Sequence, residues 1–433
     1  MSAAERVREG RPLIVLVGAP LPPPYGGIAR YMQLVVPALL ARGFRVRILQ
    51  PNQPTRPDPL TELPDDADLE SAVFEYPGLR RLAAWLLRRP SLLRRLLSSY
   101  AGALIRRPTY AMRQFGVTAC SIRSAEQLIR GERADIVHAF DWPWSYGLAA
   151  VTLAHRNEGR SMLSFFGDVL PHREELKQFD SVSRAFLTPS RQALESADLI
   201  ASMTDHCRQL VRHAGLSPDD VELVRVAGRM ESFHPGVDGS AIRAERAEQG
   251  GPLLLFVGQL RPRKGPRVLI EALPAIRERH PQARVLLVGP DHDHVAELRA
   301  LAASLGVTAA VDFVGTVTDA DLPSYYAAAD VFVFPTVTTI ECLGLTFVQA
   351  MFAGTPVVAT RIAGAPEVIR DGEHGCLVEP GDAEALANRV VHVLELPSDA
   401  REALTRRARA RASELYSEAA ILEDLFGAYD RLL

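Results

Sequence analysis

Hydrophobic residues occur both in short continuous runs, which are typical of buried strands, and at spacings of three and four, which are typical of helices. The first stretch that shows both patterns runs from residue 13 to residue 50. The apolar run 13–17 predicts a buried strand, and a glycine-containing loop follows it. Apolar positions three and four apart then predict a helix that ends at Gly43, and FRVRILQ (44–50) supplies the next strand. Strand, helix and strand in about 40 residues form a βαβ unit, which implies a parallel sheet.

Residues 253–290 repeat this plan, with Pro266 suited to the first turn of a helix. A chain of 433 residues with 47% apolar content is long enough for two domains of about 200 residues each. The predicted fold class is therefore α/β, with two Rossmann-like doubly wound domains. Neither loop contains G-x-G-x-x-G, which argues against a dinucleotide-dependent dehydrogenase.

The predicted boundaries follow composition. Residues 1–232 form the first domain, and the Gly-rich, polar stretch 233–252 is predicted as a linker. Residues 253–405 form the second domain. Residues 406–433 are predicted as a C-terminal helix that either caps the second domain or packs back across the linker.

Charge and cysteine usage exclude several classes. The formal net charge is −3, whereas a dedicated nucleic-acid-binding protein is usually strongly basic. The four cysteines form no C-x-x-C pair and no metal-ligand spacing, so neither a zinc site nor a disulfide framework is expected. The amino terminus is polar and no apolar run reaches about 18 residues, which predicts a cytoplasmic protein.

The segment 76–125 contains ten arginines and no acidic residue. Its apolar residues fall at helical spacing on either side of Pro90: Leu79, Leu82, Ala83, Leu86 and Leu87 before it, and Leu93, Leu96 and Leu97 after it. A basic amphipathic stretch with Trp85 suits the anionic inner face of a membrane, to which the protein would bind peripherally. A core-facing helix pair with a solvated basic side explains the same pattern.

Two stretches of the second half carry candidate chemistry. RPRKG places Arg261, Arg263 and Lys264 in a loop after a predicted strand, at the edge of a parallel sheet where ligands bind. Glu341 lies before a predicted helix that begins near Gly344, and free amides at a helix start suit phosphate binding. Basic side chains and free backbone N–H groups together suit a phosphate-bearing ligand.

Five ordered motifs make the chain resemble the retaining GT-B glycosyltransferases of family 4, also called glycosyltransferase group 1. They are PPPYGGIARY, VGQLRPRKG, FVGTVTDADLPSYYAAADVFVFPT, ECLGLTFVQAMFAGTPVVAT and AGAPEVIRDGEHGCLVEPGDAEALA. The resemblance is strong over 252–390 and looser over 60–130. It implies two domains facing across a cleft, with the nucleotide sugar held mainly by the second domain and the acceptor by the first. It also implies transfer without a metal or other cofactor.

The resemblance assigns roles to particular positions. The implied catalytic residues are Lys264, Glu341 and Arg263. The implied donor-binding residues are Gly26, Gly27, Gly258, Arg261, Val317, Gly344, Leu345 and Gln349. Phe166 cannot hydrogen-bond a sugar hydroxyl, and Asp168, or His138 and Asp141, are predicted to make the acceptor or sugar contact in its place.

Three positions depart from the family pattern. Gln259 stands where the family has an arginine, Phe166 where it has a histidine, and Gln349 where it has a second glutamate that accepts hydrogen bonds from ribose. The alternative interpretation is therefore a catalytically silent GT-B protein that serves as a binding or scaffold partner. An epimerase or phosphorylase of the same fold fits the motifs less well.

PDHDHVAEL has the D-x-D spacing that can hold a metal, but it opens a predicted helix, where Asp is a common cap. No metal site is therefore predicted. The expected partners are a nucleotide-sugar donor, a sugar or lipid-linked acceptor and, on the first interpretation of 76–125, an anionic membrane surface.

Overall fold

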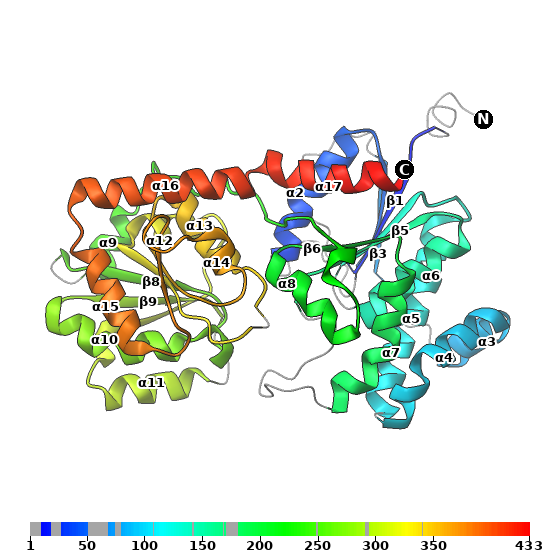
Figure 1. The fold of residues 1–433 in the computed structure, drawn as a ribbon, viewed down its shortest axis with the longest axis horizontal. Coiled ribbons are helices and arrows are strands. Elements are labelled where there is room, and N and C mark those ends of the chain that lie inside the picture. Colours follow the sequence, from blue (N-terminus) through cyan, green and yellow to red (C-terminus); the bar gives the residue numbers. More distant parts are fainter. Residues whose placement is uncertain are drawn as a thin grey trace. The chain divides into compact units, whose positions relative to one another are not determined.

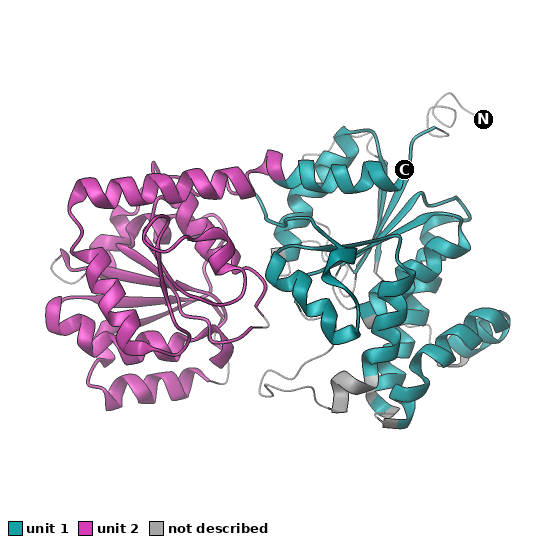
Figure 2. Cartoon of the chain, in the orientation of Figure 1, with its two compact units in different colours: residues 1–229, 421–433 teal, residues 230–420 magenta. Residues whose placement is uncertain are grey.

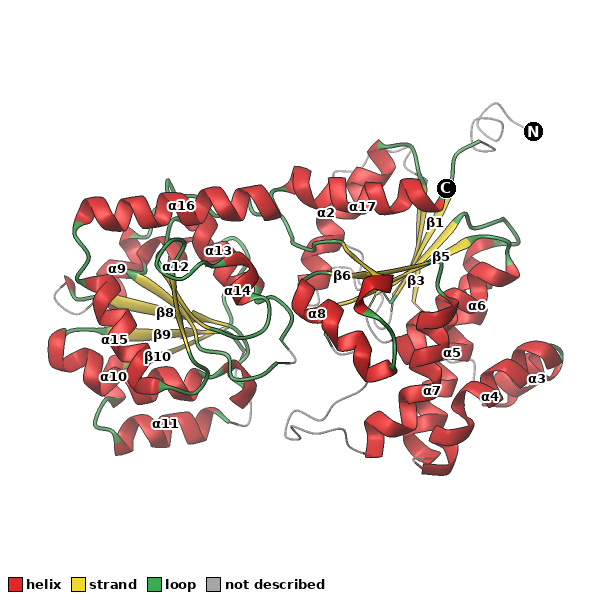
Figure 3. Ribbon diagram, in the orientation of Figure 1, coloured by secondary structure: helices red, strands yellow, loops and turns green. Residues whose placement is uncertain are grey.

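The computed structural model of the protein describes residues 10–18, 27–50, 68–73, 79–106, 108–140, 143–167, 169, 181–247, 250–290, 294–339 and 341–433. The chain divides into two compact units, residues 1–229 with 421–433 and residues 230–420 (Figure 2). Each unit is a parallel sheet covered by helices (Figures 1 and 3). The predicted α/β class with two doubly wound sheets is confirmed.

In unit 1 the described strands form one sheet in the order β3-β2-β1-β4-β5-β6-β7, with every neighbouring pair parallel. The strands are β1 (Leu13–Val17), β2 (Arg45–Gln50), β3 (Leu69–Val73), β4 (Ile136–Phe140), β5 (Arg160–Phe165), β6 (Leu199–Ser202) and β7 (Val221–Leu223). The helices are α2 (Gly27–Ala41), α3 (Leu79–Leu87), α4 (Pro90–Arg106), α5 (Pro108–Ile129), the π-helix η2 (Pro143–Gly147), α6 (Leu148–Arg156), α7 (Ser181–Ser196), α8 (Asp205–Gln209), the short η3 (Leu210–Ala214) and η4 (Pro218–Asp220), and α17 (Glu418–Leu432). The first predicted βαβ unit is β1-α2-β2.

Unit 2 has a sheet in the order β10-β9-β8-β11-β12-β13, again parallel throughout. The strands are β8 (Leu253–Val257), β9 (Arg284–Val288), β10 (Val311–Gly315), β11 (Val331–Phe334), β12 (Val357–Thr360) and β13 (Cys376–Val378). The helices are α9 (Ser240–Arg246), η6 (Pro262–Lys264), α10 (Pro266–Arg279), α11 (Val295–Ser304), η7 (Thr308–Ala310), α12 (Leu322–Ala328), α13 (Leu345–Ala353), α14 (Ala365–Val368), α15 (Ala383–Leu394) and α16 (Ser398–Tyr416). Pro266 is the first residue of α10, as its sequence predicts.

Four parallel strands begin with the same sequence, Ala-Asp followed by an aliphatic residue. They are β3 after Asp68, β4 after Asp135, β6 after Asp198 and β11 after Asp330. Three of these carboxylates accept a backbone N–H at the start of the neighbouring strand: Asp135 from Leu13 at 2.8 Å, Asp198 from Ser161 at 2.8 Å and Asp330 from Leu253 at 2.9 Å. Because a strand's first N–H has no ladder partner on that side, the aspartate supplies one.

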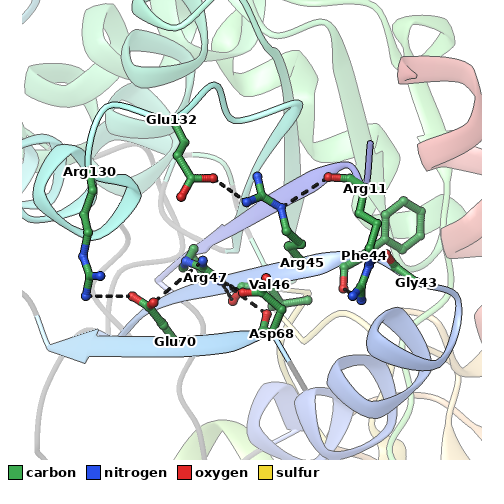
Figure 4. Close-up of polar contacts among 10 residues, drawn as sticks. All are labelled: Arg11, Gly43, Phe44, Arg45, Val46, Arg47, Asp68, Glu70, Arg130 and Glu132. Carbon is green, nitrogen blue, oxygen red and sulfur yellow. Dashed lines mark hydrogen bonds and ion pairs between the residues drawn. The ribbon is translucent and has the colours of Figure 1, made fainter. Parts of the chain in front are cut away.

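The fourth aspartate, Asp68, instead pairs with an arginine of the adjacent strand β2 (Figure 4). The buried guanidinium of Arg47 donates to its Oδ1 at 2.7 Å, and Glu70 lies 3.8 Å away on the other side. Glu70 also pairs with Arg130 at 3.3 Å. This polar cluster lies at the amino-terminal ends of β2 and β3, opposite the edge where ligands bind in parallel sheets, so its role is structural.

Two predicted boundaries change. The stretch 233–252 lies in unit 2 and contains α9, which Arg243 attaches by donating to Ala328 O at 2.7 Å and Asp330 Oδ2 at 2.8 Å. No residue of α9 is buried, so it leaves no apolar period in the sequence. The chain after 406 forms two helices rather than one, because Ser417 is extended (ψ 154°) between α16 and α17.

The leucines at helical spacing in the basic segment 76–125 lie partly in the core and partly on the surface. Leu82, Leu86 and Leu96 are buried, whereas Leu87 and Leu97 are exposed. Arg89 stacks over Trp85 at 4.7 Å and pairs with Glu126 at 3.5 Å. Helices α3 and α4 therefore face the core and also present apolar side chains outward. None of the described helices has an apolar stretch long enough to cross a membrane.

A buried polar chain fastens α17 to the centre of the unit 1 sheet. His138 on β4 is fully enclosed, with Nδ1 2.8 Å from the hydroxyl of Tyr429 on α17 and Nε2 2.7 Å from Ser164 Oγ on β5. Burial lowers the pKa of His138 to about 3. The imidazole is therefore neutral in the folded protein at pH 7.

We expect His138 to make unit 1 less stable in mild acid. In the unfolded chain a histidine takes up a proton near pH 6.5, whereas folded His138 does not, so stability falls as the pH drops below 6.5. The loss from this residue is about 2 kcal/mol between pH 8 and pH 5. Denaturant unfolding followed by tryptophan fluorescence measures it in unit 1, where all three tryptophans lie. The free energy of unfolding should be compared between wild type and His138→Gln. The difference between the two proteins should be smaller at pH 5 than at pH 8 by about 2 kcal/mol. A difference that does not change with pH would contradict the assignment.

Candidate active site

The candidate site lies at the carboxyl ends of β8 and β11 in unit 2. These strands are neighbours, although β9 and β10 intervene in the sequence, because the sheet grows outward in opposite directions from this pair. Ligands of open α/β sheets bind at such a switch point. The loop 258–265 follows β8, and the loop 335–344 follows β11.

Gly265 holds these two loops together. Its φ is +71°, and a Cβ added to it would lie 1.8 Å from the carbonyl oxygen of Pro335. Beside this contact, the carbonyl of Arg263 accepts hydrogen bonds from Thr336 Oγ1 at 2.9 Å and from the N–H of Val337 at 3.0 Å. Only glycine permits both the left-handed backbone and the close approach.

This junction brings the three predicted catalytic residues together. Lys264 Nζ donates to Glu341 Oε2, and Arg263 Nη1 lies 3.5 Å from the same oxygen. All three side chains are partly buried. Two cations face one carboxylate, so the cluster carries a net charge of +1. An anion with more than one charge is therefore attracted to it.

The start of α13 adds backbone donors to this cluster. Gly344 has φ +83°, and an added Cβ would lie 2.3 Å from the ring of Phe334. Helix α13 begins at Leu345, and among the described residues no side chain caps it. The first N–H groups of a helix have no intrahelical acceptor, so they are available to a phosphate or other acceptor.

Gln349, one turn further along α13, is buried with an exposed fraction of 3%. Its side chain lies 2.9 Å from the hydroxyl of Tyr326 on α12. Sequence interpretation missed Tyr326. Its signal is the tyrosine pair in PSYYAAAD, on a helix whose apolar residues predict packing beneath α13.

The remaining donor-site candidates lie along the same sheet edge. Gly258 follows β8 and donates its N–H to Val288 O at 2.9 Å, and Val317 is half-buried in the loop after β10. Arg261 lines a cavity of about 350 Å³ between α10 and α11. Gln259, which replaces the family arginine, is exposed. Arg263, one of the two arginines in this loop that could supply the missing charge, pairs with Glu341 at 3.5 Å.

In unit 1 the outcome differs. His138 is a core residue, because it is fully buried and both ring nitrogens have partners, so its prediction as a sugar contact is corrected. Phe166 stacks on Phe140 with ring centroids 6.1 Å apart. Gly27 is the first residue of α2. Gly26, Asp141 and Asp168 lie outside the described residues.

No group of three or more His, Cys, Asp or Glu side chains lies close enough to hold a metal ion in the part of the chain that the structure describes. The Asp residues of PDHDHVAEL lie outside that part.

Comparison with known proteins places the whole chain in context. The family model of the glycosyl transferases group 1 matches residues 239–411, and that of the glycosyl transferase 4-like domain matches residues 26–227. A D-inositol 3-phosphate glycosyltransferase 2 of Catenulispora acidiphila is 34% identical over 227 residues, which cover 50% of this chain and 53% of that protein. A D-inositol 3-phosphate glycosyltransferase of Corynebacterium efficiens is 35% identical over 47% of this chain and 50% of its own length. The chain thus spans about half the length of these curated relatives.

Solved structures match over nearly the full length. The Anabaena protein Alr3699/HepE in complex with UDP has a TM-score of 0.70 and 18% identity, covering 98% of this chain and 100% of that chain. Sucrose-phosphate synthase from Thermosynechococcus elongatus has a TM-score of 0.74 and 22% identity, covering 98% and 99%. The fold is therefore that of the GT-B proteins. The two family models together cover most of the chain, which belongs to the group 1 glycosyltransferases.

The contact between Gly265 and Pro335 predicts a sharp effect of one methyl group. Gly265→Ala should destabilise unit 2 by about 2 to 3 kcal/mol more than a substitution that meets only the left-handed backbone, because the loops must separate. Gly306→Ala is the matched control, since Gly306 also has φ +71° and nothing lies within 4 Å of its added Cβ. Chemical denaturation of both variants measures the difference. Equal losses would show that the loop contact does not constrain the site.

Proposed function

We propose that the protein transfers a sugar from a nucleotide diphosphate sugar to an acceptor hydroxyl, with retention of configuration. The observation that carries the proposal is the cluster of Lys264, Arg263 and Glu341 at the switch point of unit 2, beside the uncapped start of α13. Membership of the group 1 glycosyltransferases supports it.

The proposed chemistry follows the charges. As the bond between the anomeric carbon and the phosphate oxygen breaks, negative charge builds on the diphosphate, where Lys264, Arg263 and the N–H groups of α13 stabilise it. The acceptor oxygen bonds to the anomeric carbon, and its proton passes to the leaving phosphate oxygen. Glu341 contacts the transferred sugar. Because two side-chain cations supply the positive charge, we propose that the reaction needs no divalent metal.

Donor binding changes the partner of Lys264 in this scheme. Without ligand its ammonium is held by Glu341, which keeps it in place at the sheet edge. A diphosphate offers more negative charge than one carboxylate, so it draws the ammonium away and leaves Glu341 free to accept sugar hydroxyls. The ion pair therefore holds Lys264 where it can contact the diphosphate and Glu341 where it can accept from the sugar hydroxyls.

The comparisons suggest the first substrates to test. A structural neighbour binds UDP, so a UDP sugar is the first donor, with GDP, ADP and dTDP forms beside it. The curated relatives carry D-inositol 3-phosphate in their names, which makes a phosphorylated cyclitol the first soluble acceptor. A lipid-linked sugar is the second.

Lys264→Ala should slow transfer from the best donor by about 2 to 4 kcal/mol in kcat/KM, since it removes one cation from the departing diphosphate. Glu341→Gln should lower kcat more than it weakens binding of the bare nucleoside diphosphate. Arg267→Ala is the control, because Arg267 is exposed and pairs with Glu271. The measurements are turnover of labelled nucleotide sugar and calorimetric titration. Full activity of Lys264→Ala would remove it from the mechanism. If wild type neither binds nor turns over any of the four nucleotide types, the silent scaffold interpretation holds.

We further propose that α3–α5 bind an anionic membrane surface peripherally, at the cytoplasmic face of the cell membrane, which places the enzyme beside a lipid-linked acceptor. On α4, Arg94, Leu97 and Ile105 are exposed and share one face, since they are spaced by three and eight residues. Leu87 and Ile105 are 71% and 84% exposed, so they are available to insert into the apolar part of a membrane surface. Arg81, Arg88 and Arg113 are also exposed.

Replacing Arg81, Arg88, Arg94 and Arg113 by Gln should release the protein from vesicles that contain phosphatidylserine, with a loss of about 1 kcal/mol for each charge. Leu87→Ser with Ile105→Ser should weaken binding even at low salt, because it removes buried apolar area. Replacing Arg406, Arg407 and Arg409, which are exposed on α16, by Gln is the control. Cosedimentation measures binding. Wild type that stays in the supernatant, or an equal loss in the α16 control, would refute the membrane proposal.

A further inference from the structure

Four buried side-chain oxygen atoms in the helices of unit 1 have no hydrogen-bond partner among the described residues. They are Gln114 Oε1 and Ser121 Oγ on α5, Ser145 Oγ on η2 and Ser190 Oγ on α7. Gln114 is 4% exposed and each serine is 1% exposed or less, so bulk solvent does not reach them. Leaving such an atom unpaired costs at least as much free energy as a typical hydrogen bond contributes, so four of them need an explanation.

The packing of α5 brings its two unpaired oxygen atoms toward η2. On α5, Gln114, Thr118 and Ser121 share a face, because they are spaced by four and three residues. That face lies against η2, since Thr118 Oγ1 is 3.4 Å from the backbone oxygen of Ser145. The same Thr118 hydroxyl lies 2.8 Å from the hydroxyl of Tyr100, which is fully buried on α4.

Helix α7 adds the fourth oxygen atom from another side. The ring of Tyr100 packs edge-on against Phe186 of α7, with centroids 6.2 Å apart. Ser190 follows Phe186 by one helical turn, so it lies on the same face of α7. Helix α7 also packs against η2 and α4. The interior of the four helices α4, α5, η2 and α7 therefore collects the unpaired oxygen atoms around the hydrogen bond between Tyr100 and Thr118.

The chemistry of these atoms selects the guest that satisfies them. Gln114 Oε1 only accepts, whereas a serine hydroxyl both donates and accepts, so the guest has to donate and accept as well. A metal cation would bind the oxygen atoms, but segment 76–125, which supplies α4 and most of α5, contains ten arginines and no acidic residue. A neutral guest is therefore favoured. Water is the smallest such guest, and buried water molecules make two to four hydrogen bonds to polar groups of this kind.

We infer that ordered water molecules bind inside the layer formed by α4, α5, η2 and α7 and link the four oxygen atoms by hydrogen bonds. Helix η2 begins at Pro143, three residues after β4 ends at Phe140. The water molecules therefore hold the segment that follows the carboxyl end of β4, at the edge where ligands bind in parallel sheets. A π-helix is rare and persists where its surroundings hold it, which agrees with such an anchor. This inference does not depend on the proposed function.

The experiment joins a crystal structure of the wild type, at a resolution that shows ordered water, to urea unfolding of Ser121→Ala, Ser145→Ala and Gln114→Met. Tryptophan fluorescence follows unit 1, where all three tryptophans lie. Each replacement removes hydrogen bonds to water, so the urea midpoint should fall by about 0.3 to 0.5 M. Ser99→Ala is the matched control, because the Ser99 hydroxyl is also buried but donates to Arg95 O of its own helix at 2.8 Å. It gives the fall expected for a hydroxyl that has a protein partner.

The sign of the shift separates a hydrated interior from a dry one. If the oxygen atoms are dry, each replacement removes an unpaired polar group, so the midpoints should rise while that of Ser99→Ala falls, and the inference is wrong. Unchanged midpoints contradict it as well. A crystal structure without water between these helices overturns it, even where a variant does not fold. Water bonded to at least two of the four oxygen atoms, together with midpoints that fall, supports it.

Discussion

The close approach of Gly265 to Pro335 is the constraint on which the candidate site depends. Strands β8 and β11 are neighbours in the sheet, so the loops that follow them leave it side by side. The missing Cβ lets one backbone lie against the other, and two hydrogen bonds to Arg263 O fix the contact. Lys264 and Glu341, 77 residues apart in sequence, meet as a result. Backbone packing thus sets the side-chain geometry.

The charges of Lys264, Arg263 and Glu341 allow a bound anion to replace Glu341 as the partner of the cations. Without ligand, the carboxylate of Glu341 is paired with both cations. The cluster still has an excess positive charge, and the first N–H groups of α13, which no described side chain caps, also favour an anion. A diphosphate gains from both.

Many of the strands and helices could be predicted from the sequence, because they depend on residues close together in the chain. The run 13–17 is β1 to the residue, and Pro266 begins α10, since strand burial and proline geometry act over a few residues. Helix α9 was missed because it buries nothing, and His138 was assigned to a sugar because its partners, Ser164 and Tyr429, are 26 and 291 residues away. The contact of Tyr326 with Gln349 likewise depends on the packing of two helices, which no periodicity reports.

The three departures from the family pattern have separate physical consequences. Gln259 is exposed, and the charge it lacks is present four residues on in Arg263, beside Glu341. Phe166 is part of an aromatic stack with Phe140, which gives that position a packing role in place of a polar one. Gln349 is buried and keeps a hydrogen bond with Tyr326. A site that had lost its ligand would have no reason to retain a buried amide, two cations and an opposed carboxylate together, because each costs desolvation.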